Sequence, residues 1–183
     1  SNFSDLHPLE NESSIKLSWI NKSQNLDLFD FIVLPGSKQT IKDQLFLQEE
    51  GIIVDIKNYF YNRGNILGIC GGYQILGDIL DDPYAKESSK EQNITSIKGI
   101  GLLPLKTIFT KKKETRQITA ESLWPCRTKI IGFEIHNGRT ELIPKSRKFE
   151  VKPLFTSKDL GHYRINENGG TIVGTYIHGI LEN

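Results

Sequence analysis

A cysteine lies among glycines in the segment GICGG, residues 68–72, directly after an apolar run. The pattern G-x-C-x-G is the thiol form of the nucleophile elbow, a sharp turn between a strand and a helix. Such a turn needs residues without a β-carbon. It also places the thiol at a helix N-terminus, which lowers a cysteine pKa from its usual value of about 8.5. Cys70 is therefore predicted to be a nucleophile rather than a buried structural cysteine.

A thiol nucleophile needs a base, usually a histidine, and the chain contains four. His7 and His162 lie in polar, loop-like stretches, which favours a surface position for both. His136 in GFEIHNGRT and His178 in GTYIHG each end a predicted strand, a common place for a catalytic residue. Glu134 precedes His136 by two residues and so shares its face of the strand. Spacing alone does not decide which of these two strand-end histidines is the base.

The turn LPGSK, residues 34–38, is a second candidate for chemistry. A strand that ends in Pro-Gly before a helix leaves the amides near Gly36 and Ser37 pointing outward. Together with the amide of Gly71 they would form an oxyanion hole. The sequence GSKQT is not a nucleotide phosphate loop, because G-x-x-x-x-G-K-[ST] requires an earlier glycine and an adjacent Gly-Lys pair. Cys126 has no cysteine or histidine nearby at metal-ligand spacing, so we expect it to be structural and expect no metal here.

The elements that would position these residues alternate along the first half of the chain. They are a half-buried strand around residues 15–19, a buried strand in FDFIVLP, helices at about 41–50 and 53–60, the strand NILGI, and a helix marked by Tyr73, Leu76 and Leu80. This β-β-α-β-α order is typical of a doubly wound sheet. The second half contains the strand-like segments GLLPLKTIF, RQITAES, TKIIGFEIH and TIVGTYIHG, with a solvated turn at 111–113. The sequence thus predicts an α/β fold, mostly parallel, with an antiparallel extension.

The composition limits the classes of protein that need to be considered. A chain of 183 residues that is 37% hydrophobic and 25% charged suits one globular domain. Its net charge of +1 gives no reason to expect nucleic acid or an anionic membrane as partner. No apolar run approaches the about 20 residues of a membrane span. Two distant cysteines favour a reducing cytoplasm, and the absence of methionine favours a domain of a longer chain.

Four segments, in this order, carry a resemblance to a known family: LPGSKQT, GICGGYQILG, GFEIHNGRT and GTYIHGILEN. The second resembles the nucleophile motif of the class I, triad-type glutamine amidotransferases. All four together resemble the glutamine amidotransferase domain of the cobyric acid synthase family, of cobalamin biosynthesis. The opening SNFSDLHPL is similar to the start of that domain. The resemblance covers nearly the whole chain and implies a flavodoxin-like, three-layer class I glutamine amidotransferase fold.

The resemblance also implies roles for individual residues. Cys70 would attack the carboxamide of glutamine, form a γ-glutamyl thioester and release ammonia, while His178 relays the proton. The backbone amides of Ser37 and Gly71 would stabilise the oxyanion. Residues implied to hold the glutamine are Gly36, Gln74, Glu134 and His136.

In the family, ammonia passes to an N-terminal synthetase domain of the same chain, which uses ATP and Mg. That domain binds the corrinoid and amidates carboxylates b, d, e and g of adenosylcobyrinic acid a,c-diamide. Residues 1–183 would then be a single glutamine amidotransferase domain from the C-terminal part of a longer chain. The domain itself would hold no cofactor. Its first strand would lie just before Ser1.

One departure and several alternatives accompany this resemblance. Most triad amidotransferases carry glutamate two residues after the histidine, where this chain has Ile180. The cobyric acid synthase group also lacks that acid, which favours a Cys-His dyad. The glutaminase subunit of lipid II isoglutaminyl synthase shares E-x-H-x-G-R-T and Y-x-H-G segments, but it and cobyrinic acid a,c-diamide synthase tend to differ at LPGSKQT. A cysteine hydrolase without a synthetase, and an idle domain that only binds a partner, are the remaining alternatives.

Overall fold

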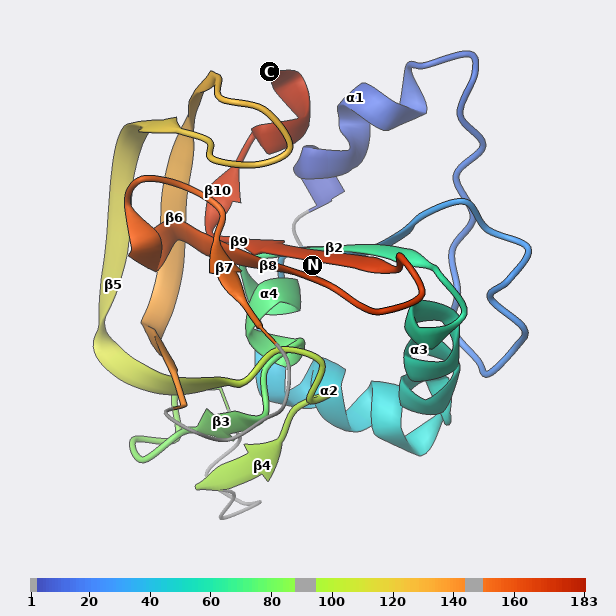
Figure 1. Ribbon diagram of the computed structural model, residues 1–183. Coiled ribbons are helices and arrows are strands. Elements are labelled where there is room, and N and C mark those ends of the chain that lie inside the picture. The colour runs from blue at the N-terminus through green and yellow to red at the C-terminus, as the bar shows by residue number, and fades with distance from the viewer. Residues whose placement is uncertain (1–2, 88–94, 144–149) are drawn as a thin grey trace.

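The computed structural model describes residues 3–87, 95–143 and 150–183, which form two β-sheets and the helices around them (Figure 1). The first sheet has the strand order β1-β2-β9-β8-β7. Its strands are β1 (Ile32–Leu34), β2 (Asn65–Ile69), β9 (Thr171–Thr175), β8 (Gly161–Ile165) and β7 (Lys152–Pro153). β1, β2 and β9 are parallel, whereas β8 and β7 continue the sheet in antiparallel fashion. The carboxyl ends of the three parallel strands therefore meet at one edge.

The second sheet has the order β10-β6-β5-β3-β4 and stands beside the first (Figure 1). Its strands are β10 (Ile177–His178), β6 (Lys129–Leu142), β5 (Leu105–Glu121), β3 (Ile79–Asp81) and β4 (Ser96–Lys98). Long antiparallel pairing joins β5 to β6, with a register shift on β5 between Ile108 and Lys113. β3 runs parallel to β5, and the other pairs are antiparallel. The fold is thus mixed α/β with parallel and antiparallel parts, as the sequence predicts.

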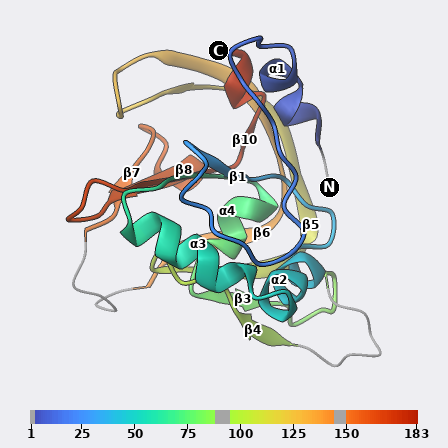
Figure 2. The same cartoon turned by 90° about the vertical axis from the view of Figure 1, so that its right-hand side faces the viewer.

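Helices lie on both sides of the first sheet and give it three layers (Figure 2). One side carries α2 (Thr40–Glu49), α3 (Ile52–Tyr61) and α4 (Gly71–Ile75), and the other carries α1 (His7–Glu10) with the 3-10 turns η1 (Phe3–Leu6) and η3 (Ile180–Glu182). A further 3-10 turn, η2, spans Lys158–Leu160. No helix in the described part of the chain is long and apolar enough to cross a bilayer.

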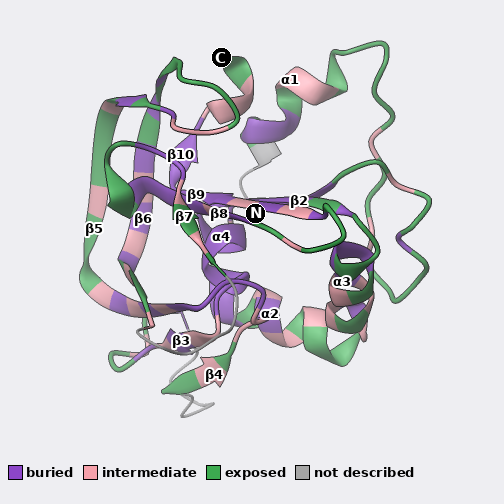
Figure 3. Ribbon diagram, viewed as in Figure 1, coloured by how far each residue is buried: buried purple, intermediate pink, exposed green. Residues whose placement is uncertain are grey.

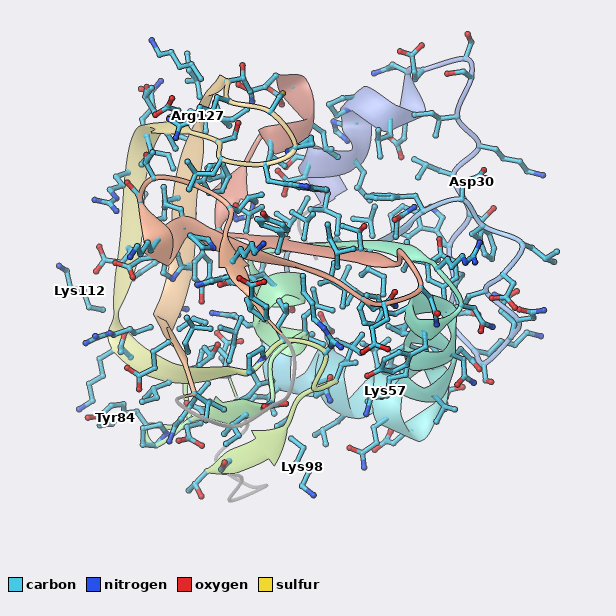
Figure 4. All side chains as sticks on the ribbon, viewed as in Figure 1. Asp30, Lys57, Tyr84, Lys98, Lys112 and Arg127 are labelled. Carbon is cyan, nitrogen blue, oxygen red and sulfur yellow. The ribbon has the colours of Figure 1, made fainter. Side chains whose placement is uncertain are left out.

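The main core lies between the first sheet and the helices below it. On α3 the side chains of Ile52, Ile56 and Phe60 recur at helical spacing and are buried. All of α4 is buried and is purple throughout in Figure 3. Charged side chains such as those of Lys112 and Arg127 point outward instead (Figure 4). This buried apolar packing holds the carboxyl end of β2, which Cys70 follows directly.

Several sequence predictions about elements are corrected by the structure. Residues 15–19 belong to no strand, because the chain there pairs with no neighbour and leaves Trp19 59% exposed. Leu80 lies in β3 rather than in a helix, because α4 already ends at Ile75. The backbone N–H of Asp78 then donates to the carbonyl of Leu105, and this hydrogen bond begins the pairing of the second sheet.

The second half also differs in detail from its prediction. GLLPLKTIF and RQITAES contribute to one strand, β5, and residues 111–113 lie inside it at the register shift rather than in a turn between strands. They are exposed, as expected. His162 is buried, with its Nδ1 2.6 Å from the hydroxyl of Tyr73, so its predicted surface position is wrong.

Candidate active site

The cysteine occupies a strained turn between β2 and α4. Cys70 has φ 51° and ψ −106°, a left-handed backbone conformation that non-glycine residues rarely adopt. A β-carbon at Gly72 would lie 1.9 Å from the carbonyl oxygen of Leu34, and one at Gly71 would lie 2.8 Å from Cβ of Ser37. The glycines are therefore required by the close approach of the LPGSK turn. The nucleophile elbow read from the sequence is present.

Strand pairing brings His178 to the elbow. β10 pairs with β6, and His178 lies opposite Phe133 in that register. The Cys70 Sγ lies 3.2 Å from the carbonyl oxygen of Ile135, and Nε2 of His178 lies 3.3 Å from the same oxygen. Thiol and imidazole thus converge on one point, and both side chains line one pocket. Of the two strand-end histidines, His178 has the position that a proton relay requires.

An acid that the sequence analysis did not single out completes this cluster. His178 Nδ1 lies 2.7 Å from Oδ2 of Asp5, and Oδ1 of Asp5 accepts a 2.9 Å hydrogen bond from the Gly179 amide. The carboxylate is 4% exposed. With Nδ1 held by Asp5, Nε2 is the nitrogen that faces the thiol. Asp5, His178 and Cys70 therefore follow one another as acid, imidazole and nucleophile, the order of a catalytic triad.

The electrostatics of this cluster favour a charged imidazole. Burial lowers the pKa of His178, but hydrogen bonds to Asp5 and to the Cys70 sulfur, together with the charges of both groups, outweigh burial and raise that pKa to about 10. His178 is consequently an imidazolium at neutral pH and a proton donor beside the Cys70 sulfur. The cluster thus places the Cys70 sulfur, a nucleophile, beside the His178 imidazolium, a proton donor.

Glu134 and His136 form a second cluster behind the first. Oε1 of Glu134 lies 2.9 Å from Nε2 of His136, and its Oε2 accepts a 2.6 Å hydrogen bond from Nε of Arg116. Burial raises the pKa of Glu134, but the hydrogen bonds from His136 and Arg116 lower it below its usual value. The second ring nitrogen of His136, Nδ1, faces the carbonyl of Gly138 at 3.0 Å. Both nitrogens are engaged away from the thiol, so His136 is not placed to take its proton.

The pocket in front of the cysteine has a volume of about 470 Å³. It is lined by Gly36, Ser37, Lys38, Thr40, Cys70, Gln74, Glu87, Lys113, Ile135, His136, Asn137 and His178. Gln74 is buried and its Nε2 donates to the Asn137 carbonyl and to the Tyr176 hydroxyl. Glu134 lines a neighbouring pocket instead.

Six of the eight residues proposed for the site line this pocket; Gly71 lies at the elbow against Ser37, and Glu134 contacts His136 from the neighbouring pocket. Within the described ranges, no group of three or more histidine, cysteine, aspartate or glutamate side chains is arranged to hold a metal ion. Cys126 lies apart from the pocket and is exposed.

Comparison with known proteins identifies the family. Residues 1–183 match the family described as the CobB/CobQ-like glutamine amidotransferase domain. Two relatives are cobyric acid synthases of Prochlorococcus marinus: that of strain AS9601 is 62% identical and that of strain NATL1A 45% identical, each over 183 residues and the full chain. The chain spans only 36% and 37% of their respective lengths.

Solved structures show the same fold. A crystal structure of a glutamine amidotransferase has a TM-score of 0.66 at 13% identity, over 99% of this chain and 87% of that one. The structure of PurLQS from Thermotoga maritima has a TM-score of 0.62 at 18% identity, over 94% and 79%. At these identities the likeness concerns the fold. With a family match over its whole length, the chain belongs to the CobB/CobQ-like glutamine amidotransferase domains.

Proposed function

We propose that this chain is the glutamine-hydrolysing domain of a cobyric acid synthase. It would release ammonia from glutamine through a Cys70 thioester. The ammonia would serve ATP-dependent amidation of carboxylates b, d, e and g of adenosylcobyrinic acid a,c-diamide. One observation carries the proposal: a thiol and an imidazolium converge in a pocket of a chain 62% identical to a protein named cobyric acid synthase.

The first half of the reaction follows from the Cys70–His178 pair. The thiolate of Cys70 attacks the carboxamide carbon of glutamine, and the oxyanion that forms accepts hydrogen bonds from the amides of Ser37 and Gly71. The Ser37 nitrogen lies 2.9 Å from the place of a β-carbon on Gly71, which supports joint action of the two amides. Nε2–H of His178 gives its proton to the leaving nitrogen, the C–N bond breaks, and ammonia departs from a thioester.

The second half returns the enzyme to its starting state. His178, now neutral at Nε2, takes a proton from water, and the resulting hydroxide attacks the thioester carbon. The C–S bond breaks, glutamate leaves, and the Cys70 thiolate is restored beside the imidazolium. Asp5 stays bonded to Nδ1 throughout, so that Nε2 keeps facing the reacting atoms.

The synthetase belongs to the part of the protein outside residues 1–183 in this proposal. The chain covers 36% of the length of its relatives, which leaves room for an ATP- and Mg-dependent domain that also binds the corrinoid. Residues 1–183 are proposed as one domain without a cofactor of its own, with glutamine as its substrate.

We also propose that the first strand of the domain lies before Ser1 and inserts beside β1. β1 ends its sheet, with β2 as its neighbour on the other side. On its open side, residues 16–20 and 31–35 line an apolar groove of about 270 Å³. Leu6 lines the same groove, so the start of the described chain already reaches it.

The test is substitution of the nucleophile in the full-length enzyme. Cys70→Ala should abolish amidation with glutamine and leave amidation with added ammonium intact, because only the supply of ammonia is lost. Cys126→Ala is the matched control, since that thiol is exposed and lies outside the pocket. A folded Cys126→Ala enzyme that is equally inactive with glutamine would show that the assignment is wrong.

A further inference from the structure

The pocket contains a buried carboxylate that the reaction steps do not use. Glu87 is 9% exposed and is the single carboxylate among the described residues that line the pocket. Its backbone is fixed by Asp82, whose carboxylate oxygens accept hydrogen bonds of 2.7 and 2.9 Å from the amides of Lys86 and Glu87. These two hydrogen bonds fix the backbone of the short loop, so that the Glu87 side chain is held in the pocket.

Oε2 is the more firmly engaged oxygen of this carboxylate in its contacts with described residues. Oε2 accepts a 2.8 Å hydrogen bond from the amide of Thr40, the first residue of α2. Oε1 has a long contact of 3.5 Å with Nδ2 of Asn137 and retains capacity for a further donor. Among the described residues, no lysine, arginine or histidine forms an ion pair with Glu87. Burial raises its pKa, as expected of a carboxylate that still lacks a cation.

A cation lines the same pocket. Lys113 follows the register shift of β5 and pairs with Asn137 of β6. Asn137 also reaches Glu87, so Asn137 is a neighbour of both charged residues, and all three line the pocket. The neighbouring Lys112 points away into solvent (Figure 4). Its Nζ lies 3.6 Å from Oε1 of Glu114, and neither residue lines the pocket.

We infer that Glu87 binds the α-ammonium group of the substrate glutamine and Lys113 its α-carboxylate. The inference rests on the proposed function, and it adds the means by which the site recognises a free amino acid. A zwitterionic head group needs one anion and one cation, and this pair supplies both on one side of the pocket while Cys70 and His178 supply the chemistry. Glu87 then excludes glutamine side chains within proteins, whose α-nitrogen is an uncharged amide.

The experiment compares glutamine with glutaramate, which is glutamine without its α-amino group, as substrates of the full-length enzyme. Glu87→Gln keeps an oxygen that can accept from Thr40 but removes the charge. We expect it to lower kcat/KM for glutamine about 10- to 100-fold, chiefly through KM, because a hydrogen bond to a charged group is lost. With glutaramate its kcat/KM should stay within about twofold of wild type, since the interaction removed is absent there already.

Lys113→Met should affect glutamine and glutaramate alike, unlike Glu87→Gln. Both substrates carry the carboxylate, so both should lose affinity to a similar degree, and the preference for glutamine should persist. Lys112→Met and Glu141→Gln are the controls, because both residues are exposed on the same ribbon and lie outside the pocket. Alkylation of Cys70 by the neutral reagent iodoacetamide reports whether each variant retains the thiol environment.

The outcomes separate this inference from the proposed function. A wild-type enzyme that does not hydrolyse glutamine contradicts the proposed function itself. A wild type that hydrolyses it, together with a Glu87→Gln enzyme that keeps the wild-type ratio of glutamine to glutaramate turnover, overturns the head-group assignment alone. Equal loss with both substrates and slower alkylation of Cys70 would mean that Glu87 only anchors α2, and would likewise overturn it.

Discussion

His178 keeps its proton through a hydrogen bond that joins the two ends of the sequence. Asp5 and His178 are 173 residues apart, yet Oδ2 of Asp5 lies 2.7 Å from Nδ1 of the imidazole. Burial by itself would favour a neutral ring, and the hydrogen bonds and charges of Asp5 and Cys70 reverse this. The residue two positions beyond the histidine, Ile180, cannot supply a charge. At the scale of residues, the site obtains its acid from a different element of the fold.

Removal of this acid should change the pH dependence of catalysis. In the proposed mechanism the protonated imidazole is the active form, so activity should persist up to its pKa of about 10 and fall as the pH rises through that value. Asp5→Asn lowers the pKa, because the neutral amide stabilises the imidazolium less, and the alkaline limb of kcat/KM for glutamine should move to lower pH. The imidazole of the Asp5→Asn enzyme is also less firmly held. Its kcat/KM should therefore lose part of the about 10²–10⁴-fold that general acid–base catalysis contributes.

Glu182→Gln is the control for Asp5→Asn, measured as glutamine hydrolysis across a pH series. Glu182 is the acid nearest to His178 in sequence, but its side chain is exposed in η3. We expect less than about a tenfold change, well below the loss of a catalytic acid–base residue. Loss of activity in a folded Glu182→Gln enzyme, with a normal profile in Asp5→Asn, would assign the acid to Glu182 instead.

At the scale of elements, the pairing of β10 with β6 decides which histidine lies beside the thiol. The pairing sets His178 beside the thiol, whereas His136 turns both nitrogens toward Glu134 and Gly138. His178→Ala should lose most glutaminase activity, about 10²–10⁴-fold in kcat. His136→Ala should lose less, and mainly through KM, since His136 lines the pocket without contacting the sulfur. Steady-state kinetics on both variants decide, and a larger fall in kcat at His136 reverses the assignment.

The same element carries a further expectation for Glu134. It holds His136 in place and binds Arg116, so Glu134→Gln should affect glutamine hydrolysis more than Glu182→Gln does. The route is the position of His136 in the substrate pocket. KM for glutamine should rise in parallel in the Glu134→Gln and His136→Ala enzymes, and an unchanged KM in both would contradict this.

The sequence was informative where structure is local. The elbow at Cys70 and the helix over Ile52–Tyr61 could be predicted because glycine geometry and helical periodicity act within a few residues. The extension of β5 through residues 111–113 could not, because it depends on pairing with β6. The contact of Asp5 with His178 could not be predicted either, because nothing in SNFSDLHPL indicates that this acid meets a histidine near the other end of the chain.

At the scale of the whole molecule, the first sheet has one covered flank and one open flank. β7 and β8 extend it on one side, whereas β1 faces a groove whose lining includes Leu17, Trp19 and Ile20. Trp19, Phe31 and Ile15 remain 59%, 47% and 42% exposed. Apolar surface of this extent next to the end strand of a sheet is typical of an interaction site.

Extension of the chain should therefore stabilise it. A version of residues 1–183 extended by the strand proposed before Ser1 should bury this surface beside β1. At about 25 cal/mol per Å² of apolar area, we expect the melting temperature to rise by about 5 °C or more. Calorimetry of the two chains tests this. An equal melting temperature, with Trp19 fluorescence unchanged, would exclude the groove as the site of that strand.

The bond between Asp5 and His178 also links two equilibria that are usually treated separately. η1 carries Asp5 and is docked beside η3, so whatever displaces η1 removes the group that keeps His178 charged. By thermodynamic reciprocity, a charged His178 holds η1 in place by the same factor as a docked η1 raises the proton affinity of His178. The proton on one imidazole is thus an allosteric ligand of the N-terminal segment, and the position of that segment sets the readiness of the thiol.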